Sequence, residues 1–312
     1  DWMNIKNVAI LGAGAVGSYI IWGLSKRKDI RLGVIAEGER AVRLTKGLNI
    51  NKHLYKPEIW EPAHTPQIDL LVVCLKYGAL ADALGDIQAV TSENTIIMSL
   101  MNGVESENII GEAVGQAKVL PALIKVASQR NSDGVVFDPD TTIGIIYGEY
   151  KAPFVSNRVK AVQALFDGTG IHYSVTEHII EEIWSKFRLN VCNNLPQAIL
   201  GAGVGCYRDS EHMKAIKHGL RQELEAIAKA KGIDMSLTAK ASGHGSVVNS
   251  SARYSTLQDL DAHRHTEIDM FSGAIIKMGQ ELGIPTPYNE YTYHIIKALE
   301  EKNDGKFDYP IM

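Results

Sequence analysis

The chain of 312 residues is 45% hydrophobic and 22% charged, which suffices to bury a substantial core and favours two domains over one. Its net charge of -4 and its lack of a Lys and Arg cluster argue against a nucleic-acid-binding protein, which needs such a cluster to contact phosphates. Its longest apolar runs, residues 69–75 and 95–101, are far shorter than the roughly 20 residues of a membrane-spanning helix, so we expect no membrane partner.

The first half of the chain alternates short runs of Val, Ile and Leu with helical patterns. This alternation is typical of a parallel sheet that helices cover on both faces. The pattern therefore predicts an α/β fold, with a doubly wound parallel sheet in an N-terminal domain over residues 1–177. The predicted strands occupy residues 7–11, 31–35, 70–75, 95–100, 119–123 and 142–147.

The second half, residues 178–312, is helical in pattern almost throughout and predicts an all-helical C-terminal domain. Gly232 follows the first long helical pattern, where a C-terminal cap belongs. The segment Thr266-Glu-Ile-Asp269 has the form of a capping box and predicts the start of another helix. The predicted helices occupy residues 213–231, 266–282 and 289–301.

A glycine-rich turn follows the first predicted strand. Glycines in this pattern allow a tight turn, a close approach of the backbone to pyrophosphate and close packing of helix on strand, while the helix N-terminus offers N–H groups to phosphate. Because a strand precedes the turn and a helical pattern follows it, we interpret it as the dinucleotide-binding turn of a Rossmann-type domain. The alternative is a glycine turn with a purely structural role. The residues of the turn are Gly12, Ala13, Gly14, Ala15, Val16 and Gly17.

The end of the second predicted strand bears on the choice of dinucleotide. Glu37 lies 20 residues after Gly17. A carboxylate there accepts hydrogen bonds from the ribose hydroxyls of NAD and repels the 2′-phosphate of NADP. The position therefore favours NAD(H) over NADP(H). In the competing interpretation, Arg40 or Arg43 clamps a 2′-phosphate.

Two later strand ends add polar groups. Lys76 follows the strand predicted at residues 70–75, and Asn102 follows the strand predicted at residues 95–100. Doubly wound sheets bind ligands at the carboxyl ends of their strands, so we expect both side chains to contact the dinucleotide. The alternatives are a solvated lysine and a turn formed by Asn102 and Gly103, because Asn-Gly is a common turn dipeptide.

Lys186, Asn190 and Asn194 recur every four positions in the second half. On an α-helix this spacing places one cation and two amides along a single stripe, where a core-facing helix would carry Leu or Ile. The stripe therefore suits a small polar ligand. The alternative is a solvated helix face that ends near Pro196.

Six motifs occur in a fixed order between residue 8 and about residue 287. This order resembles that of the ketopantoate reductase family, also called the 2-dehydropantoate 2-reductase family. The glycine turn is generic to many dehydrogenases, whereas the last three motifs are specific. The motifs are the glycine turn, Leu75-Lys76, Leu100-Met-Asn-Gly103, Trp184-Ser-Lys186 with Asn190 and Asn194, Ser255-Thr-Leu-Gln-Asp259 and Thr266-Glu-Ile-Asp269.

The resemblance implies an oxidoreductase that reduces 2-dehydropantoate to pantoate, a step of pantothenate and coenzyme A biosynthesis, with hydride from NAD(P)H. It implies that Lys186 is the general acid, which neutralises the negative charge on the carbonyl oxygen. Glu267 matches the acid that holds the substrate hydroxyl and interacts with the lysine; its alternative role is a first-turn acid that complements a helix dipole. The family is often dimeric, which implies a homodimer.

The same resemblance implies a set of substrate-binding residues. Asn102 matches an amide on the nicotinamide side, and Ser255 matches a hydroxyl that binds the substrate carboxylate. Asn190 and Asn194 match amides that contact the 2-oxo acid. We expect this substrate to enter between the two domains, opposite the dinucleotide.

Two features of the chain depart from the family. Typical members use NADPH and carry a basic residue at the end of the second strand, where this chain has Glu37. Arg253 and Tyr254 replace the small residues and proline that usually precede the serine motif. Two alternatives therefore stay open, a related reductase of a different 2-oxo or 3-hydroxy acid and a non-catalytic dinucleotide sensor.

Histidines and cysteines form no evident metal site in the sequence. His263 and His265 lie near Glu267, but no third ligand has a suitable spacing, so we expect no metal. The three cysteines are widely separated and fit neither a disulfide framework nor a metal-ligand spacing. The chain begins without the layout of a signal peptide. We therefore expect a cytoplasmic protein.

Overall fold

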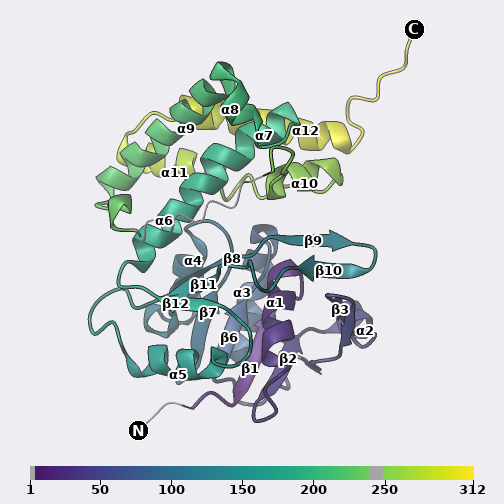
Figure 1. Cartoon of the computed structure of the whole chain (residues 1–312), viewed down its shortest axis with the longest axis vertical. Coiled ribbons are helices and arrows are strands. Elements are labelled where there is room, and N and C mark those ends of the chain that lie inside the picture. Colours follow the sequence, from purple (N-terminus) through teal and green to yellow (C-terminus); the bar gives the residue numbers. More distant parts are fainter. Residues whose placement is uncertain (1–3, 239–248) are drawn as a thin grey trace. The chain divides into compact units, whose positions relative to one another are not determined.

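The structure is a computed structural model that describes residues 4–238 and 249–312. The chain divides into two compact units (Figure 1). The first contains Asp1–Asn102 and Ser106–Ile180, and the second contains Gly103–Glu105 and Glu181–Met312. Within the described ranges, all strands belong to the first unit, and every regular element that lies wholly in the second is helical. This division into a sheet unit and a helical unit confirms the predicted fold class.

A five-stranded parallel sheet forms the centre of the first unit, in the spatial order β5-β2-β1-β6-β7. Four of its strands agree with the predicted strands within two residues. The edge strand β5 was not predicted, because it has only three residues. β5 packs closely on β2 at Gly33, where a Cβ would lie 2.2 Å from the ring of Trp60. The strands are β1 (Asn7–Leu11), β2 (Arg31–Ile35), β5 (Glu58–Trp60), β6 (Leu70–Val73) and β7 (Ile96–Ser99).

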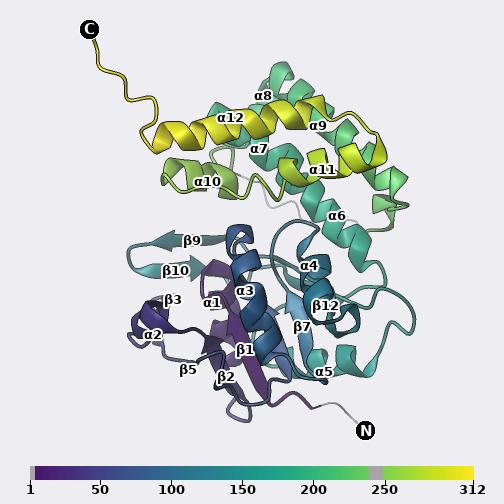
Figure 2. The ribbon, with the colours of Figure 1, turned by 180° about the vertical axis from the view of Figure 1, so that it is seen from behind.

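Both faces of this sheet are buried, which explains the continuous apolar runs of its strands. Val8 and Ile10 of β1 point into a cluster with residues of α1 and α5, whereas Ala9 and Leu11 point into a cluster with residues of α3 and α4. Successive residues of the strand thus enter two different apolar layers. Figure 2 shows α3 in front of the sheet. These helices are α1 (Ala15–Leu24), α3 (Tyr77–Val90), α4 (Ser106–Val114) and α5 (Asn157–Phe166).

The last two predicted strands lie mostly outside the central sheet, so this part of the prediction was wrong. Val119, at the start of the predicted strand 119–123, forms an isolated parallel bridge with Ile97 of β7, but β8 and β11 belong to another sheet. β8 and β11 pair antiparallel and form a separate sheet of order β12-β11-β8. The reason is the connection between them: a hairpin of β9 and β10 takes the place of the crossover helix that a parallel pair needs. The hairpin also joins β3 and β4 in a small sheet. These elements are β3 (Leu48–Ile50), β4 (His53–Tyr55), β8 (Ala122–Lys125), β9 (Ser128–Asn131), β10 (Gly134–Phe137), β11 (Gly144–Tyr147) and β12 (Tyr173–Val175), with the short helices α2 (Gly38–Leu44) and η1 (Gln116–Lys118).

The second unit is built around α9, which packs against α11 and α12 (Figure 2). The predicted bounds of α9 agree with the structure within two residues, and Gly232 follows it with φ +74°. No helix in the described ranges is long and apolar enough to cross a bilayer. The elements are α6 (Ile179–Leu189), η2 (Asn190–Asn194), α7 (Leu195–Leu200), α8 (Cys206–Asp209), α9 (Glu211–Ala230), η3 (Met235–Leu237), α10 (Ser255–Asp261), α11 (Ser272–Leu282) and α12 (Pro287–Asn303).

The segment before α11 corrects the predicted helix start. α11 begins at Ser272 and not at Thr266, so the predicted capping box and the alternative role of Glu267 as a first-turn acid are both wrong. The backbone N and the Oγ1 of Thr266 both donate to Oε2 of Glu300 in α12, at 2.8 and 2.7 Å. Thr266 Oγ1 also accepts from the N of Ile268 at 3.2 Å. Because these groups are bound in this way, they do not cap a helix.

Glu107 is a buried carboxyl in the first turn of α4, with 6% of its surface exposed. Ser106 Oγ lies 3.2 Å from Glu107 Oε2 and donates to it, and it also lies 2.7 Å from Ser99 Oγ. Burial raises the pKa of Glu107 to about 7, although hydrogen bonds from its own backbone, Ser106 and the backbone of Ala122 oppose the shift. A protonated carboxyl is therefore the more stable form at this position below neutral pH.

We expect Glu107→Gln to stabilise the protein in a pH-dependent way. The unfolded carboxyl releases its proton near pH 4.5, whereas the folded one keeps it up to about pH 7. The unfolding free energy of the wild type therefore falls as the pH rises through this window, while that of the neutral Gln variant does not. The difference between the two reaches at most about 3 kcal/mol at pH 8. Urea unfolding at pH 4 and pH 8 measures it. Glu112→Gln, on the exposed side of α4, is the control, and an equal effect of both variants would contradict the prediction.

Candidate active site

The pairing of the central strands sets a common edge for the predicted cofactor residues. Leu11 pairs with Val73, and Val73 pairs with Ser99, so β1, β6 and β7 end in register. Gly14, Lys76 and Asn102 each follow one of these partners by three residues. The first unit thus brings the glycine turn and two of the predicted polar residues to the same edge of the sheet, where doubly wound folds bind ligands.

Each glycine of the turn has a different surrounding. A Cβ on Gly12, whose φ is +100°, would lie 2.6 Å from the carbonyl oxygen of Cys74, and a Cβ on Gly17 would lie 2.0 Å from that of Gly12. A Cβ on Gly14 would have no atom within 4 Å. Gly14 also precedes α1, which has no side-chain cap. The turn therefore offers an open, uncapped helix N-terminus, which fits a pyrophosphate.

Glu37 lies directly before α2, with extended backbone and an exposed side chain. It follows β2, which is the neighbour of β1 in the sheet. This places its carboxylate at the same sheet edge as the glycine turn. Arg40 and Arg43 lie within α2 and are also exposed. Each interpretation of the cofactor thus has a candidate residue here. Glu37 at the start of α2 suits NAD(H), and Arg40 or Arg43 within α2 suits NADP(H).

The Lys186, Asn190 and Asn194 stripe crosses a change of helix type. Residues Asn190–Asn194 form a π-helical turn between α6 and α7, so the prediction of one α-helix was wrong for these residues. Pro196 is one cause, because it lacks an N–H and its ring excludes an α-helical carbonyl four residues earlier. The wider π turn changes the position of Asn194 about the helix axis relative to Asn190. Such turns are frequent at functional sites.

Burial differs along this stripe. Asn190 is 7% exposed, whereas Lys186 and Asn194 are half-buried. The stripe is therefore not a solvated helix face. The neighbouring Asn193 has a buried side-chain oxygen, Oδ1, which has no hydrogen-bond partner within the part of the chain that the structure describes. An unsatisfied buried oxygen is unusual in a native protein, and a bound water, ion or polar ligand is one explanation for it.

Ser255 and Glu267 lie in two other parts of the second unit, at the start of α10 and in the segment before α11. Ser255 is the first residue of α10, is exposed, and α10 packs against α7 and η2. Thr256, which follows Ser255, is buried, and its Oγ1 has no hydrogen-bond partner among the described residues. Glu267 is half-buried in the segment that Glu300 holds through Thr266. Thr256 and Glu300 were not predicted as site residues, because the burial that distinguishes them has no local pattern in the sequence.

No metal site is evident in residues 4–238 and 249–312. Groups of three or more His, Cys, Asp or Glu with metal-binding geometry are absent from these ranges. His265 Nε2 lies 2.6 Å from Asp304 Oδ2, and its Nδ1 lies 3.8 Å from Glu300 Oε1. His263 is exposed and has φ +55°. His265 thus contacts the carboxylate of Glu300 in α12 and that of Asp304, which directly follows α12.

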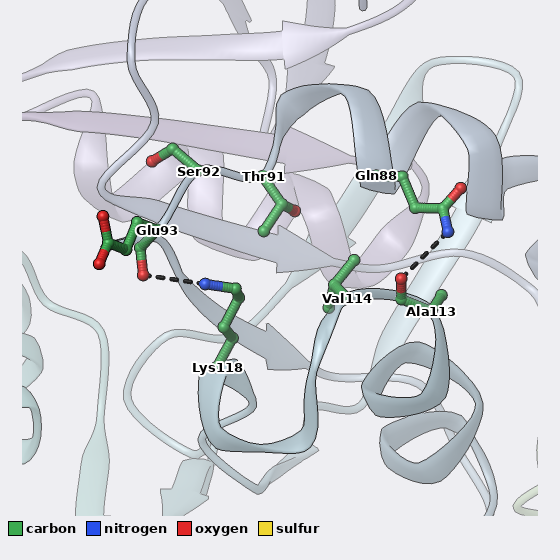
Figure 3. Close-up of a pocket in the computed structure, with 7 residues that line it drawn as sticks. All are labelled: Gln88, Thr91, Ser92, Glu93, Ala113, Val114 and Lys118. Atoms are coloured by element: carbon green, nitrogen blue, oxygen red, sulfur yellow. Dashed lines mark hydrogen bonds between the residues drawn. The ribbon is translucent and has the colours of Figure 1, made fainter.

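A surface pocket of about 420 Å³ lies at the opposite edge of the central sheet (Figure 3). It is formed where α3 and α4 end, before β7 and β8 begin. Lys118 Nζ donates to the carbonyl oxygen of Glu93 at 2.9 Å, and Gln88 Nε2 donates to that of Ala113 at 3.0 Å. The polar groups of this pocket thus bind one another, and none belongs to the predicted site.

Two sequence profiles match most of the chain. The profile described as "Ketopantoate reductase PanE/ApbA" matches residues 8–148, and "Ketopantoate reductase PanE/ApbA C terminal" matches residues 178–300. The chain belongs to the ketopantoate reductase family. It is therefore an NAD(P)-dependent oxidoreductase whose cofactor is a nicotinamide dinucleotide, which confirms the predicted family and enzyme class.

Relatives and solved structures cover nearly the whole chain. The 2-dehydropantoate 2-reductase of Pyrococcus horikoshii is 27% identical over 96% of this chain and 99% of that protein. A PanE/ApbA family ketopantoate reductase from Ralstonia eutropha has a TM-score of 0.80 and 24% identity, over 96% of this chain and 100% of that one. D-mandelate dehydrogenase with NADH and anilino(oxo)acetate has a TM-score of 0.79 and 21% identity, over 96% and 99%. Likeness at these identities shows the fold and leaves the substrate open.

Gly14→Ala should weaken dinucleotide binding without unfolding the protein. Its φ of -79° suits alanine, and the added Cβ meets no protein atom, but it occupies the space that a pyrophosphate would approach. We expect the Kd for NADH and NADPH to rise about tenfold or more, equivalent to about 1.4 kcal/mol. Calorimetric titration measures this change. Gly85→Ala, in open space on α3, is the control and should leave Kd unchanged; equal Kd values for Gly14→Ala and wild type would contradict the prediction.

Proposed function

We propose that the chain reduces 2-dehydropantoate to pantoate with a nicotinamide dinucleotide. The observation that carries the proposal is the burial of two neighbouring polar residues: Lys186 is half-buried, and Asn190, about one turn later, is buried. An ammonium group and a carboxamide supply the hydrogen-bond donors that the carbonyl and carboxylate of a 2-oxo acid accept. The proposal assigns dinucleotide binding to residues 1–177 and substrate binding to residues 178–312.

The proposed roles follow from the charge that develops during reduction. NAD(P)H, when bound, supplies the hydride that adds to the carbonyl carbon. Lys186 donates a hydrogen bond to the carbonyl oxygen and gives it a proton as its negative charge develops. Asn190 and Asn194 orient the 2-oxo acid, and Ser255 binds its carboxylate. Glu267 holds the substrate hydroxyl and orients the ammonium group of Lys186.

Two alternatives differ from this proposal in substrate. D-mandelate dehydrogenase resembles the chain as closely in fold as the ketopantoate reductase from Ralstonia eutropha does, which favours a second 2-oxo acid as a candidate. A reductase that forms a 3-hydroxy acid is the other. A non-catalytic sensor is not supported, because the chain belongs to a family of oxidoreductases.

A panel of substrates tests the proposed function. Purified protein is incubated with NADH or NADPH and with ketopantoate, phenylglyoxylate, pyruvate, a branched aliphatic 2-oxo acid or a 3-oxo acid. Loss of absorbance at 340 nm reports turnover. The proposal expects the highest kcat/KM for ketopantoate. A higher kcat/KM for phenylglyoxylate, the oxidation product of mandelate, would show that phenylglyoxylate and not ketopantoate is the preferred substrate.

Lys186→Ala should lower kcat while dinucleotide binding stays nearly intact. Loss of a general acid lowers the rate by roughly 10²–10⁴-fold. Lys186→Arg keeps the positive charge but does not release a proton readily, so it should also lose most activity. Steady-state kinetics and calorimetric titration with NADH measure the two effects. Lys229→Ala, on the exposed face of α9, is the control and should keep full activity. Full activity of Lys186→Ala would show that Lys186 is not the general acid.

We further propose NADH as the preferred cofactor. Glu37 would accept hydrogen bonds from the adenosine ribose, and its charge would repel a 2′-phosphate. Lys76 and Asn102 would contact the dinucleotide further along the sheet edge, Asn102 on the nicotinamide side. Arg40 and Arg43 support the opposite preference, because a guanidinium on α2 suits a phosphate.

Glu37→Arg should shift the cofactor ratio toward NADPH. The change replaces a repulsive charge beside the 2′-phosphate by an attractive one, and we expect the ratio of kcat/KM values to move by about tenfold or more. The substrate panel with both cofactors measures it. Glu39→Arg, two residues further on and also exposed, makes the same change of charge and is the control. An unchanged ratio in Glu37→Arg would show that Glu37 does not contact the ribose.

A homodimer in the cytoplasm, acting in pantothenate biosynthesis, completes the proposal. Exposed apolar side chains on helices of the second unit support a contact between two copies. These include Ile216 on α9, which is 38% exposed, and Tyr291 on α12, which is 69% exposed. Sedimentation equilibrium, which gives the mass in solution, tests the dimer.

A further inference from the structure

Gln197 is a fully buried carboxamide in the first half of α7. Both ends of its side chain bind the same distant segment. Its Nε2 donates to the carbonyl oxygen of Ala252 at 2.8 Å, and its Oε1 accepts from the backbone N of Tyr254 at 2.8 Å. The side chain therefore holds two backbone groups that are two residues apart, and the second belongs to the residue directly before Ser255.

The segment before Ser255 needs this support. Tyr254 precedes α10 without a side-chain cap, and no strand within the described part of the chain pairs with residues 250–254. Two backbone hydrogen bonds also hold the segment, from Val204 N to Ala252 O and from Gly205 N to Ser250 O, both at 2.9 Å. Neither reaches past Ala252. Beyond it, Gln258 Nε2 donates to the carbonyl oxygen of Arg253 at 2.7 Å, and Gln258 N donates to that of Tyr254 at 2.9 Å. The oxygen of Gln197 accepts from the N–H of Tyr254 and so joins this last peptide before Ser255 to α7.

Gln197 is also joined to the π-helical turn. In a regular α-helix its backbone N would donate to the carbonyl oxygen of Asn193. Instead, it donates to the hydroxyl of Tyr207 at 2.9 Å, and this hydroxyl donates to the carbonyl oxygen of Asn193. A hydroxyl inserted in this way opens the helical ladder. One residue thus connects the turn that carries Asn190 and Asn194 with the segment that precedes Ser255.

We propose that Gln197 is a positioning residue that fixes Ser255 relative to Asn190 and Asn194, and so sets the affinity for the carboxylate of the 2-oxo acid. The inference rests on the proposed function, because it takes Ser255 as the group that binds the carboxylate. Gln197 does not touch the substrate in this role. Its buried amide acts through the backbone of Ala252 and Tyr254, and a buried hydrogen bond restrains that backbone more tightly than one exposed to water.

The test uses the full-length enzyme and the 2-oxo acid that it reduces best. Gln197→Met keeps the length of the side chain but removes both hydrogen bonds. We expect KM for the 2-oxo acid to rise about tenfold, kcat to change less than threefold and Kd for NADH to stay unchanged. Gln197→Glu keeps an oxygen for the N of Tyr254 but sets a second acceptor against the carbonyl oxygen of Ala252, so it should also raise KM. Gln88→Met is the control, because Gln88 Nε2 donates to the carbonyl oxygen of Ala113 from an exposed position in the first unit, and its loss should leave KM unchanged.

A double-mutant cycle separates positioning from general destabilisation. If Gln197 acts through Ser255, Gln197→Met should change KM little in a Ser255→Ala background, whereas a general loss of stability should act equally in both backgrounds. Hydrogen exchange at the amide of Tyr254 should be faster in Gln197→Met than in wild type. An unchanged KM in Gln197→Met, or equal effects in both backgrounds, overturns the proposal for Gln197. If the wild-type enzyme reduces no 2-oxo acid, the proposed function itself fails, and the role of Gln197 fails with it.

Discussion

The register of the parallel sheet is the constraint on which the first unit depends. β1, β6 and β7 pair so that Leu11, Val73 and Ser99 lie side by side, and each is followed by residues proposed to hold the dinucleotide. A slip of one residue would exchange side chains between two apolar layers with different neighbours. The polar groups at the sheet edge are therefore positioned by the packing of apolar side chains within the strands, and they are not part of those apolar layers. Gly12 and Gly17 extend this constraint into the turn, because neither has room for a Cβ.

The second unit positions its polar groups by buried hydrogen bonds. Tyr207 opens the helix between Asn193 and Gln197, Gln197 holds the segment before Ser255, and Glu300 binds both polar groups of Thr266. Loops lack the ladders that fix strands, so a few satisfied polar side chains supply the restraint. Loss of one partner would leave the other buried and unpaired, which costs about 1–3 kcal/mol.

Elements with a local cause could be predicted from the sequence, and elements with a distant cause could not. The glycine turn, β1 and α9 follow from the spacing of a few neighbouring residues. The segment before α11 is held by Glu300, 34 residues after Thr266, and the segment before α10 is held by Gln197, 57 residues before Tyr254. The π-helical turn has a partial signal in Pro196, but the insertion of a tyrosine hydroxyl gives no local pattern. The order of the candidate residues along the chain predicts the site, whereas their burial and hydrogen bonds depend on residues that are distant in the sequence.

The residues proposed to choose the cofactor and those proposed to choose the substrate are under different physical constraints. Glu37 is exposed and precedes α2, in which no residue is buried, so its replacement disturbs little packing. Asn190 is buried in η2 beside Val191 and Cys192, which are part of the core. A change at Asn190 therefore alters both the site and the helix packing, and its cost in stability limits the substitutions that are tolerated. Cofactor preference should for this reason vary more readily among related chains than the residues that contact the 2-oxo acid.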